Sequence, residues 1–483
     1  MSVVKLDIST SPEALFRKIG GEGGAFWIDG QAAGGATFMG FAPEAQLILH
    51  ADGTLEIEHR GRREMLAGDP LEAIEEFVAA VPPLSASGAA PRTIGYFAYD
   101  LVALLEARIR PRRDAGCTLP LARLARYDAV VEWPAPSADA RRERNAKLQI
   151  HAADAAAAER CRAVLCRRAS DASSMPSSAI ENVVPHVLEA PRADVHLRAV
   201  ERALAYIAAG DVYQVNLAQR FRVRSDAPPS EVYLRLREAQ RVPFGAFLDC
   251  GGFAILCGSP ERFLRVAGAS IETEPIKGTR PRDVVPERDA ALRAALLADP
   301  KERAEHVMIV DLERNDLGRS CVAGSVAVPS LMRVESFATL HHIVSTVRGT
   351  LRADVGLAEL LRATFPGGSI TGAPKIRAAQ VIAELEDAPR EAYTGAVAWF
   401  RGPRDFDSAI AIRTAVARDG IYTYHAGGGI VADSDPQREY AECLLKAEPF
   451  LRALRVAPYA TATASVTGRE DGAAATVAPR LRA

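Results

Sequence analysis

Two pairs of glutamates have the spacing of a single helix face. Glu302 and Glu305 lie three apart in the segment KERAEHVMIVDLERNDLGR, and Glu439 and Glu442 repeat this spacing in REYAECLLKA. Residues three apart are neighbours on a helix surface. Two such pairs could close on one hard cation, since Mg²⁺ prefers oxygen ligands and often takes only one or two protein carboxylates. The alternative is two solvated helix faces, where glutamate at this spacing is common.

Three segments combine glycine with hydroxyl residues. They are PIKGT (275–279), FPGGSITGAPK (365–375) and AGGGIVADSDP (426–436). Glycine lets the backbone approach an anion closely, and successive N–H groups form a concave anion site. We interpret the segments as turns that suit a small dianionic molecule. Tight turns between strands without a ligand are the alternative.

Lysine, glutamate and histidine side chains supply a candidate nucleophile, acid and base. Lys277 lies between Ile276 and Gly278, and a lysine held in a partly buried turn can lose its proton and attack a substrate. Glu261 in SPERF and His342 in HHIVSTV are the available acid and base types. Taken alone, a lysine such as Lys277 is usually a surface charge, and a lone histidine such as His342 is more often a hydrogen-bonded structural residue.

Taken in order along the chain, these motifs resemble the chorismate-utilising enzymes. That family includes anthranilate synthase, isochorismate and salicylate synthases, and aminodeoxychorismate synthase component I. The resemblance covers about residues 196–456 through nine ordered motifs: GDVYQVNLAQRF, SPERF, PIKGT, KERAEHVMIVDLERNDLGR, HHIVSTVRG, FPGGSITGAPK, YTGAVAW, DSAIAIRTA and AGGGIVADSDPQREYAECLLKA. GYFAYD (95–100) is similar to the amino-terminal region of the anthranilate and aminodeoxychorismate branch.

The resemblance implies a role for each matching position. Glu305 and Glu442 become direct ligands of Mg²⁺, supported by Glu302 and Glu439, and the metal holds the carboxylate on the chorismate ring. The residues implied to contact that ring carboxylate are Gly278, Thr279 and Lys446. Those implied to hold the enolpyruvyl carboxylate are Tyr393, Arg413 and the N–H of Gly429. His342 lies beside the reacting ring, and Glu261 protonates the departing ring hydroxyl.

Two positions choose among the reactions of the family. Enzymes that add water to chorismate resemble one another in having a lysine at the position of Gln214, and glutamine cannot act as a base at neutral pH. Anthranilate synthases usually read PIAGT where this chain reads PIKGT. PIKGT is the aminodeoxychorismate pattern, so the resemblance implies that Lys277 bonds to the ring and that ammonia then displaces it, giving 4-amino-4-deoxychorismate for 4-aminobenzoate and folate synthesis.

Ammonia must reach such a site from elsewhere. None of the seven cysteines lies in the GxCxG context of a glutamine amidotransferase. We therefore expect a glutamine amidotransferase partner. Nothing after Ala447 resembles an aminodeoxychorismate lyase, so we expect pyruvate elimination to need another protein. Two rival functions stay open: the large subunit of anthranilate synthase, and a non-catalytic chorismate-binding subunit.

Several elements must position these residues. Apolar periodicity predicts helices over 70–81 and 196–209, and we expect helices around both glutamate pairs. Strands are predicted over 25–28, 46–50, 129–133 and 148–151, with two more around the Gly251-Gly252 turn. By resemblance the fold class is α+β, with large antiparallel β-sheets packed face to face, flanking helices, and the active site between the sheets.

Composition divides the chain into four predicted parts. They are an N-terminal anthranilate synthase component I-like region (1–135), a variable segment and linker (136–192), a chorismate-binding catalytic domain (193–456) and a disordered tail (457–483). Residues 152–168 are read as a surface helix within the second part.

Bulk properties exclude several classes of function. The chain has 483 residues and a net charge of −2, which argues against nucleic acid or an anionic membrane as the partner. No apolar run approaches the roughly 20 residues that span a bilayer. The N-terminus shows no signal-peptide pattern, and the seven cysteines are scattered without a CxxC pair. We therefore predict a cytoplasmic protein.

Overall fold

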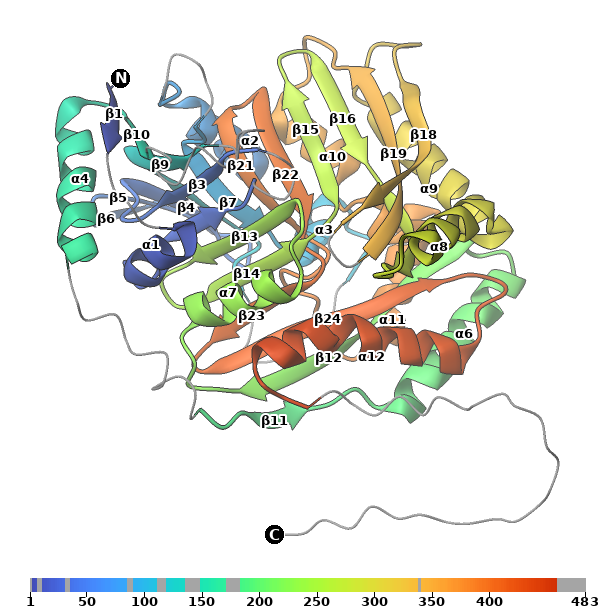
Figure 1. Cartoon of the computed structure of the whole chain (residues 1–483). Helices are drawn as coiled ribbons and strands as arrows, with labels where there is room; N and C mark the ends of the chain where they lie inside the picture. The colour runs from blue at the N-terminus through green and yellow to red at the C-terminus, as the bar shows by residue number, and fades with distance from the viewer. Residues whose placement is uncertain are drawn as a thin grey trace.

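Two large antiparallel sheets, each of 12 strands, dominate the fold (Figure 1). The structure is a computed structural model that describes residues 2–6, 11–30, 35–84, 90–110, 119–134, 148–170, 183–337 and 340–457. The two sheets and the helices outside them confirm the predicted α+β class.

The first sheet contains strands from both ends of the chain. In spatial order they are β1 (Ser2–Leu6), β10 (Leu148–Ala152), β9 (Ala129–Trp133), β3 (Thr37–Gly40), β2 (Phe26–Ile28), β13 (Phe244–Asp249), β14 (Ala254–Ser259), β23 (Thr414–Arg418), β24 (Ile421–Ile430), β12 (Gln214–Arg224) and β11 (His186–Glu189), with β20 (Gly372–Ala373) also paired to β12. The pairing of β2 with β13 joins the N-terminal region to the catalytic region.

The second sheet also combines strands from the N-terminal region and the catalytic region. In spatial order its strands are β17 (Ile276–Pro281), β19 (Leu340–Thr350), β16 (Ser270–Glu274), β15 (Arg262–Ala267), β22 (Asp405–Ile410), β21 (Ala396–Gly402), β7 (Thr93–Phe97), β8 (Ala122–Arg126), β4 (Ala45–Leu49), β5 (Leu55–His59) and β6 (Arg62–Leu66), with β18 (Ala327–Ser336) also paired to β19. Strands from the predicted parts 1–135 and 193–456 therefore share both sheets. The division into four parts itself stays a prediction, and residues 135–147, 171–182 and 458–483 lie outside the described residues.

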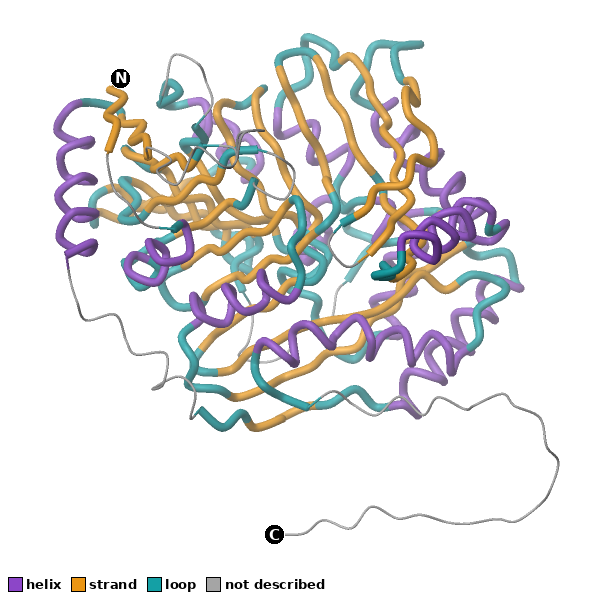
Figure 2. The backbone as a smooth tube through the Cα atoms, viewed as in Figure 1, coloured by secondary structure: helices purple, strands orange, loops and turns teal. Residues whose placement is uncertain are grey.

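Helices cover the outer faces of the sheets (Figure 2). They are α1 (Pro12–Ile19), α2 (Pro70–Ala79), α3 (Val102–Leu105), α4 (Ala155–Ser170), α6 (Ala193–Ala208), α7 (Pro229–Ala239), α8 (Pro286–Ala298), α9 (Pro300–Gly318), α10 (Leu357–Thr364), α11 (Lys375–Leu385) and α12 (Pro436–Ala453), with 3-10 turns η2 (Tyr99–Leu101) and η3 (Gly368–Ile370). Helix α2 begins as predicted because Asp69 accepts hydrogen bonds from two backbone N–H groups of its first turn.

The core between the sheets follows from the alternation of side chains along each strand. In β13, Phe244, Ala246 and Leu248 face the second sheet, which contributes Ile94 and Trp399 to the same cluster. On the outer face of the first sheet, residues of α1, α4, α7 and α12 form a separate apolar cluster. A third cluster joins α2, α9 and α10 to the second sheet. The sheets therefore pack face to face, as predicted.

Two glycine-rich segments form strands, contrary to their interpretation as turns. Residues 276–279 of PIKGT lie in β17, where a β-bulge between Lys277 and Thr279 places Gly278 at φ +67°. AGGGI lies in β24, fully paired with β12. In both cases long-range strand pairing outweighs the local preference of glycine for turns. FPGGSITGAPK does contain a turn, η3, followed by the short strand β20.

Candidate active site

Ser369 contacts two of the predicted catalytic side chains. Its hydroxyl donates a hydrogen bond of 2.7 Å to Glu261 Oε1, and its carbonyl oxygen accepts one of 3.3 Å from Lys277 Nζ. Glu261 lies just before β15, Lys277 lies in β17, and Ser369 lies in η3. The strands and the glycine-rich turn therefore bring an amine and a carboxyl group to one point.

The carboxyl group of Glu261 is buried, with 4% of the residue exposed. Burial raises its pKa, while the hydrogen bond from Ser369 and the charge of Lys277 oppose the rise. The backbone N–H of Ile276 also donates to Oε1, at 3.4 Å. A carboxyl with a raised pKa keeps its proton at higher pH and can act as a general acid.

The amine of Lys277 has the opposite shift. Burial lowers its pKa, and the charges of Glu261 and Glu305 oppose this effect. A lowered pKa increases the neutral fraction of the amine, which is the nucleophilic form. The environment therefore moves both Lys277 and Glu261 toward their uncharged states.

His342 is a neutral imidazole beside the β-bulge of β17. Its Nδ1 lies 3.2 Å from the carbonyl oxygen of Gly278 and 3.1 Å from Thr279 Oγ1. Because a carbonyl only accepts, this contact assigns the proton to Nδ1 and leaves the lone pair on Nε2. Burial lowers the pKa of His342 to about 4. The ring also packs against Phe337, with centroids 5.7 Å apart.

Lys446 lies on helix α12, and Arg413 lies directly before β23. Lys446 Nζ donates to the carbonyl of Gly427 at 2.8 Å and forms an ion pair of 2.6 Å with Glu442. Arg413 has φ +52°, and its Nη1 donates to the carbonyl of Lys446 at 2.9 Å. Arg413 also lies near enough to His342 for its charge to lower the pKa of that imidazole. Two cationic side chains thus surround the predicted carboxylate sites.

Tyr393 lies shortly before β21, and Gly429 lies in β24, where it pairs with β12. The Tyr393 side chain is buried and stacks on His425, with ring centroids 5.3 Å apart and planes 18° apart. Gly429 faces Gln214, whose Nε2 is 2.5 Å from the position that a Cβ on Gly429 would take. The Gln214 amide is fully buried and has no hydrogen-bond partner among the described residues.

The four glutamates come from two helices, as the sequence predicted. Glu302 and Glu305 lie on α9, and Glu439 and Glu442 lie on α12. Burial raises the pKa of Glu305, and the negative charge of Glu439 adds to the rise, so the two helices present their acids to each other. Lys446 lowers the pKa of Glu442. Crowded acids with raised pKa values gain stability from a bound cation.

Glycines let the backbone lie directly against these acids. A Cβ on Gly278 would lie 3.1 Å from Glu302 Oε2, and one on Gly428 would lie 3.1 Å from Glu439 Oε2. Within the described ranges, no three His, Cys, Asp or Glu side chains gather closely enough to hold a metal ion. Magnesium commonly takes one or two protein carboxylates and completes its shell with water and substrate oxygens. The carboxylates of α9 and α12 are oxygen ligands of the type that magnesium prefers.

Some residues of the site were not individually identified from the sequence. Ser369 was noted only as part of a glycine-rich motif, although a hydroxyl residue inside such a motif is the signal that could have identified it. Glu313 accepts hydrogen bonds from the N–H groups of Gly368 and Ser369, at 3.1 and 3.2 Å. Burial raises the pKa of Glu313, and the negative charge of Asp316 adds to the rise. Nothing in the local sequence indicates its contact with a turn 55 residues away.

Known proteins resemble this chain across most of its length. A family model described as chorismate binding enzyme matches residues 23–452. Aminodeoxychorismate synthase component 1 of Klebsiella aerogenes is 48% identical over 250 residues, covering 52% of this chain and 55% of that protein. Anthranilate synthase component 1 of Aquifex aeolicus is 46% identical over 258 residues, covering 53% of this chain and 52% of that protein. The chain thus aligns with only about half the length of these relatives.

A solved structure shares the fold. Anthranilate synthase component I from Streptococcus pneumoniae superposes with a TM-score of 0.70 at 30% sequence identity, covering 86% of this chain and 92% of that one. In addition, no helix in the described part of the chain is long and apolar enough to cross a membrane.

Proposed function

Since the chain belongs to the family of chorismate binding enzymes, we propose that it replaces the ring hydroxyl of chorismate with an amino group and so forms 4-amino-4-deoxychorismate. The relative named aminodeoxychorismate synthase component 1 supports this reaction. The observation that carries the proposal is the partly buried amine of Lys277, which shares Ser369 with the carboxyl group of Glu261.

The proposed chemistry uses two displacements in place of one difficult substitution. The lone pair of Lys277 forms a C–N bond to the ring carbon next to the enolpyruvyl-bearing carbon, on the side of the conjugated double bonds and away from the carbon that carries the hydroxyl. The ring double bond shifts, and the C–O bond of the ring hydroxyl breaks as Glu261 donates its proton, releasing water. Ammonia then adds at the vacated carbon, the double bond shifts back, and the bond to Lys277 breaks. The surplus proton of the added ammonia returns to Glu261.

The other predicted residues bind and orient the substrate in this proposal. Gly278, Thr279 and Lys446 contact the ring carboxylate, while Arg413, Tyr393 and the Gly429 N–H hold the enolpyruvyl carboxylate. A guanidinium group is a suitable partner for a carboxylate because it donates two parallel hydrogen bonds. His342 would lie beside the ring as a neutral group.

Magnesium is the proposed cofactor. When bound, it would neutralise and orient the ring carboxylate. Glu305 and Glu442 are the proposed direct ligands, and Glu302 and Glu439 support them. The support for this assignment is the convergence of α9 and α12. Burial and neighbouring glutamates raise the pKa values of Glu305 and Glu439, and the charge of Lys446 lowers the pKa of Glu442.

Ammonia is proposed to come from a glutamine amidotransferase partner. The words "component 1" in the name of the Klebsiella relative support a second component. A separate aminodeoxychorismate lyase would then release 4-aminobenzoate for folate synthesis. A cytoplasmic location is part of the same proposal, in keeping with the six described cysteines, all of which are free thiols.

The large subunit of anthranilate synthase is the second candidate, because the Aquifex relative and the Streptococcus structure both carry that name. Identifying the product separates the two. Purified protein with chorismate, ammonium and Mg²⁺ should accumulate a compound that an added lyase converts to 4-aminobenzoate. Release of fluorescent 2-aminobenzoate without the lyase would refute the proposal and establish the second candidate.

A further inference from the structure

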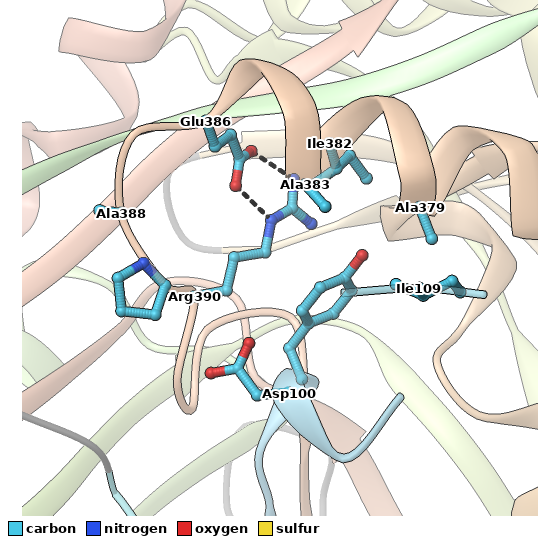
Figure 3. Close-up of a pocket in the computed structure, with 10 residues that line it drawn as sticks. Asp100, Ile109, Ala379, Ile382, Ala383, Glu386, Ala388 and Arg390 are labelled. Carbon is cyan, nitrogen blue, oxygen red and sulfur yellow. Dashed lines mark hydrogen bonds and ion pairs between the residues drawn. The ribbon is translucent and has the colours of Figure 1, made fainter. Parts of the chain in front are cut away.

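Arg390 is a fully buried arginine behind the proposed substrate site, with only 2% of its surface exposed. Its guanidinium forms a two-pronged ion pair with Glu386, through Nε at 2.8 Å and Nη2 at 2.6 Å (Figure 3). The backbone N–H of Ala218 also donates a hydrogen bond to Glu386 Oε1, at 2.9 Å. Since Glu386 is the C-cap residue of α11, the pair is held at the end of α11 and against β12.

The remaining donors of Arg390 reach three separate segments of the site. Nη2 donates to the carbonyl of Asn216 in β12 at 2.9 Å, and Nη1 donates to the carbonyl of Ile370 at 3.3 Å. Nη1 also donates to Thr394 Oγ1 at 3.1 Å. Ile370 follows Ser369, Asn216 is two residues beyond Gln214, and Thr394 follows Tyr393. One guanidinium group therefore ties together the backbones that present all three of those side chains.

Aromatic rings lie within cation–π range of this guanidinium. The Tyr99 ring, from the GYFAYD motif, has its centroid 4.8 Å from Cζ, and the Tyr393 ring has its centroid 5.6 Å away. Cation–π contacts of this length are strongest when both groups are shielded from water. Tyr99, Glu386 and Arg390 also line a small pocket beside the ion pair.

Arg390 also acts on Tyr393 through its positive charge, which affects the pKa of the Tyr393 hydroxyl. Burial raises the pKa of the Tyr393 hydroxyl, and the positive charge of Arg390 opposes that rise. A cation near a phenol makes its O–H a stronger donor toward an anion. Tyr393 is the tyrosine proposed to hold the enolpyruvyl carboxylate.

We infer that Arg390, backed by Tyr99 and Glu386, is the positioning residue that sets Tyr393 for the enolpyruvyl carboxylate of chorismate. The inference rests on the proposed function and adds the N-terminal GYFAYD motif to the substrate site. Arg390 itself touches no reacting atom. Its effect on the reaction passes through Tyr393 and through the segments that carry Gln214 and Ser369.

Calorimetric titration of chorismate in the presence of Mg²⁺ and without ammonium tests this inference. Arg390→Lys keeps the charge but loses the fork that serves several acceptors at once. We expect its apparent Kd to rise about tenfold, the loss of about one charged hydrogen bond. Tyr99→Leu keeps all the hydrogen-bond partners of Arg390 and removes the aromatic ring beside it together with the ring hydroxyl. Tyr99→Leu provides the test if Arg390→Lys does not fold. Its Kd for chorismate should rise at least threefold, which is about half the loss of binding free energy expected for Arg390→Lys.

Arg92→Lys is the matched control. Arg92 is also a buried arginine, paired with Glu44 at 3.1 Å and donating to the carbonyl of Pro82 at 2.7 Å. Its variant should lose stability like Arg390→Lys while binding chorismate within about twofold of the parent. Folded Arg390→Lys and Tyr99→Leu proteins that bind like the parent would overturn the inference. A parent that does not bind chorismate would instead overturn the proposed function.

Discussion

Lys277 and Glu261 are joined through a single residue, because Ser369 accepts from the lysine amine with its carbonyl and donates to the glutamate with its hydroxyl. Each charge also acts on the pKa of the other, raising that of Lys277 and lowering that of Glu261, while burial moves both in the opposite direction. The charge of each group therefore favours the charged form of the other, whereas burial favours the uncharged form of both. The uncharged pair is the form that the proposed first step needs.

Glu261→Gln should remove the proton donor while keeping an acceptor for Ser369. We expect kcat to fall about 100- to 10,000-fold, the usual contribution of a general acid. The parent should show a bell-shaped dependence of kcat/KM on pH, since the amine must be deprotonated and the carboxyl protonated. The variant should lose one limb of that bell. A variant with the full bell and more than a tenth of the parent's kcat would exclude Glu261 as the acid.

Glu442→Gln should weaken the response to magnesium. Glu442 pairs with Lys446 one helical turn away, and we propose it as a direct ligand. We expect at least about ten times more Mg²⁺ to be required for half-maximal activity, since even supporting residues of metal sites cost this much. Glu448→Gln is the control, because Glu448 pairs with Arg452 on the same helix at the same spacing. Overlapping magnesium titrations for Glu442→Gln and the parent would remove Glu442 from the ligand set.

Gly278→Ala should damage the bulge that carries Thr279. The residue has φ +67°, and a Cβ would lie 2.9 Å from Leu296 Cδ1. Gly268→Ala is a matched control with φ +63° and no atom within 4 Å of the new Cβ. Both variants should lose about 1–2 kcal/mol of unfolding free energy to backbone strain. Only Gly278→Ala should also raise the KM for chorismate, and equal KM values in the two variants would contradict our assignment.

His196 should make the fold sensitive to acid. It is 1% exposed on α6, its ring centroid lies 5.6 Å from that of Tyr440, and neither ring nitrogen has a hydrogen-bond partner among the described residues. Burial lowers its pKa from 6.5 to about 4. The unfolded chain therefore binds the extra proton first, and stability is present above pH 6.5 and falls as pH drops toward 4, by up to about 3 kcal/mol.

His196→Phe should remove this part of the acid sensitivity. Denaturant unfolding of parent and variant at pH 7 and pH 4.5 gives the two pH-dependent losses of free energy. The loss should be smaller in the variant by about 2–3 kcal/mol. The same loss in both proteins would show that His196 takes up its proton without cost in the fold.

Local signals in the sequence were sufficient for much of the fold. Strand β9 has the predicted bounds, and α2 begins at the predicted Pro70 because Asp69 caps it. PIKGT was misread because proline and glycine suggest a turn, whereas pairing with β19, more than 60 residues away, makes it a strand. The arrangement of two sheets came from the family resemblance, since strand order depends on contacts between distant segments.

In the candidate site, too, local spacing in the sequence predicted some features, whereas contacts between distant segments were missed. Spacing alone indicated that each glutamate pair shares a helix face, and the structure brings Glu305 and Glu439 together from α9 and α12. Glu313 and Arg390 were missed because their partners lie in other segments, Ser369 and Asn216 among them. A buried ion pair or hydrogen bond between residues far apart in the sequence leaves no periodic pattern in that sequence.

Mass spectrometry of the protein quenched during incubation with chorismate and Mg²⁺ tests the central claim most directly. We predict a covalent adduct on Lys277, with the mass of chorismate less one water, because the amine displaces the ring hydroxyl. Lys277→Ala should carry no adduct. An unmodified Lys277 in protein that is turning over chorismate, or the same adduct in Lys277→Ala, would contradict the proposed covalent mechanism.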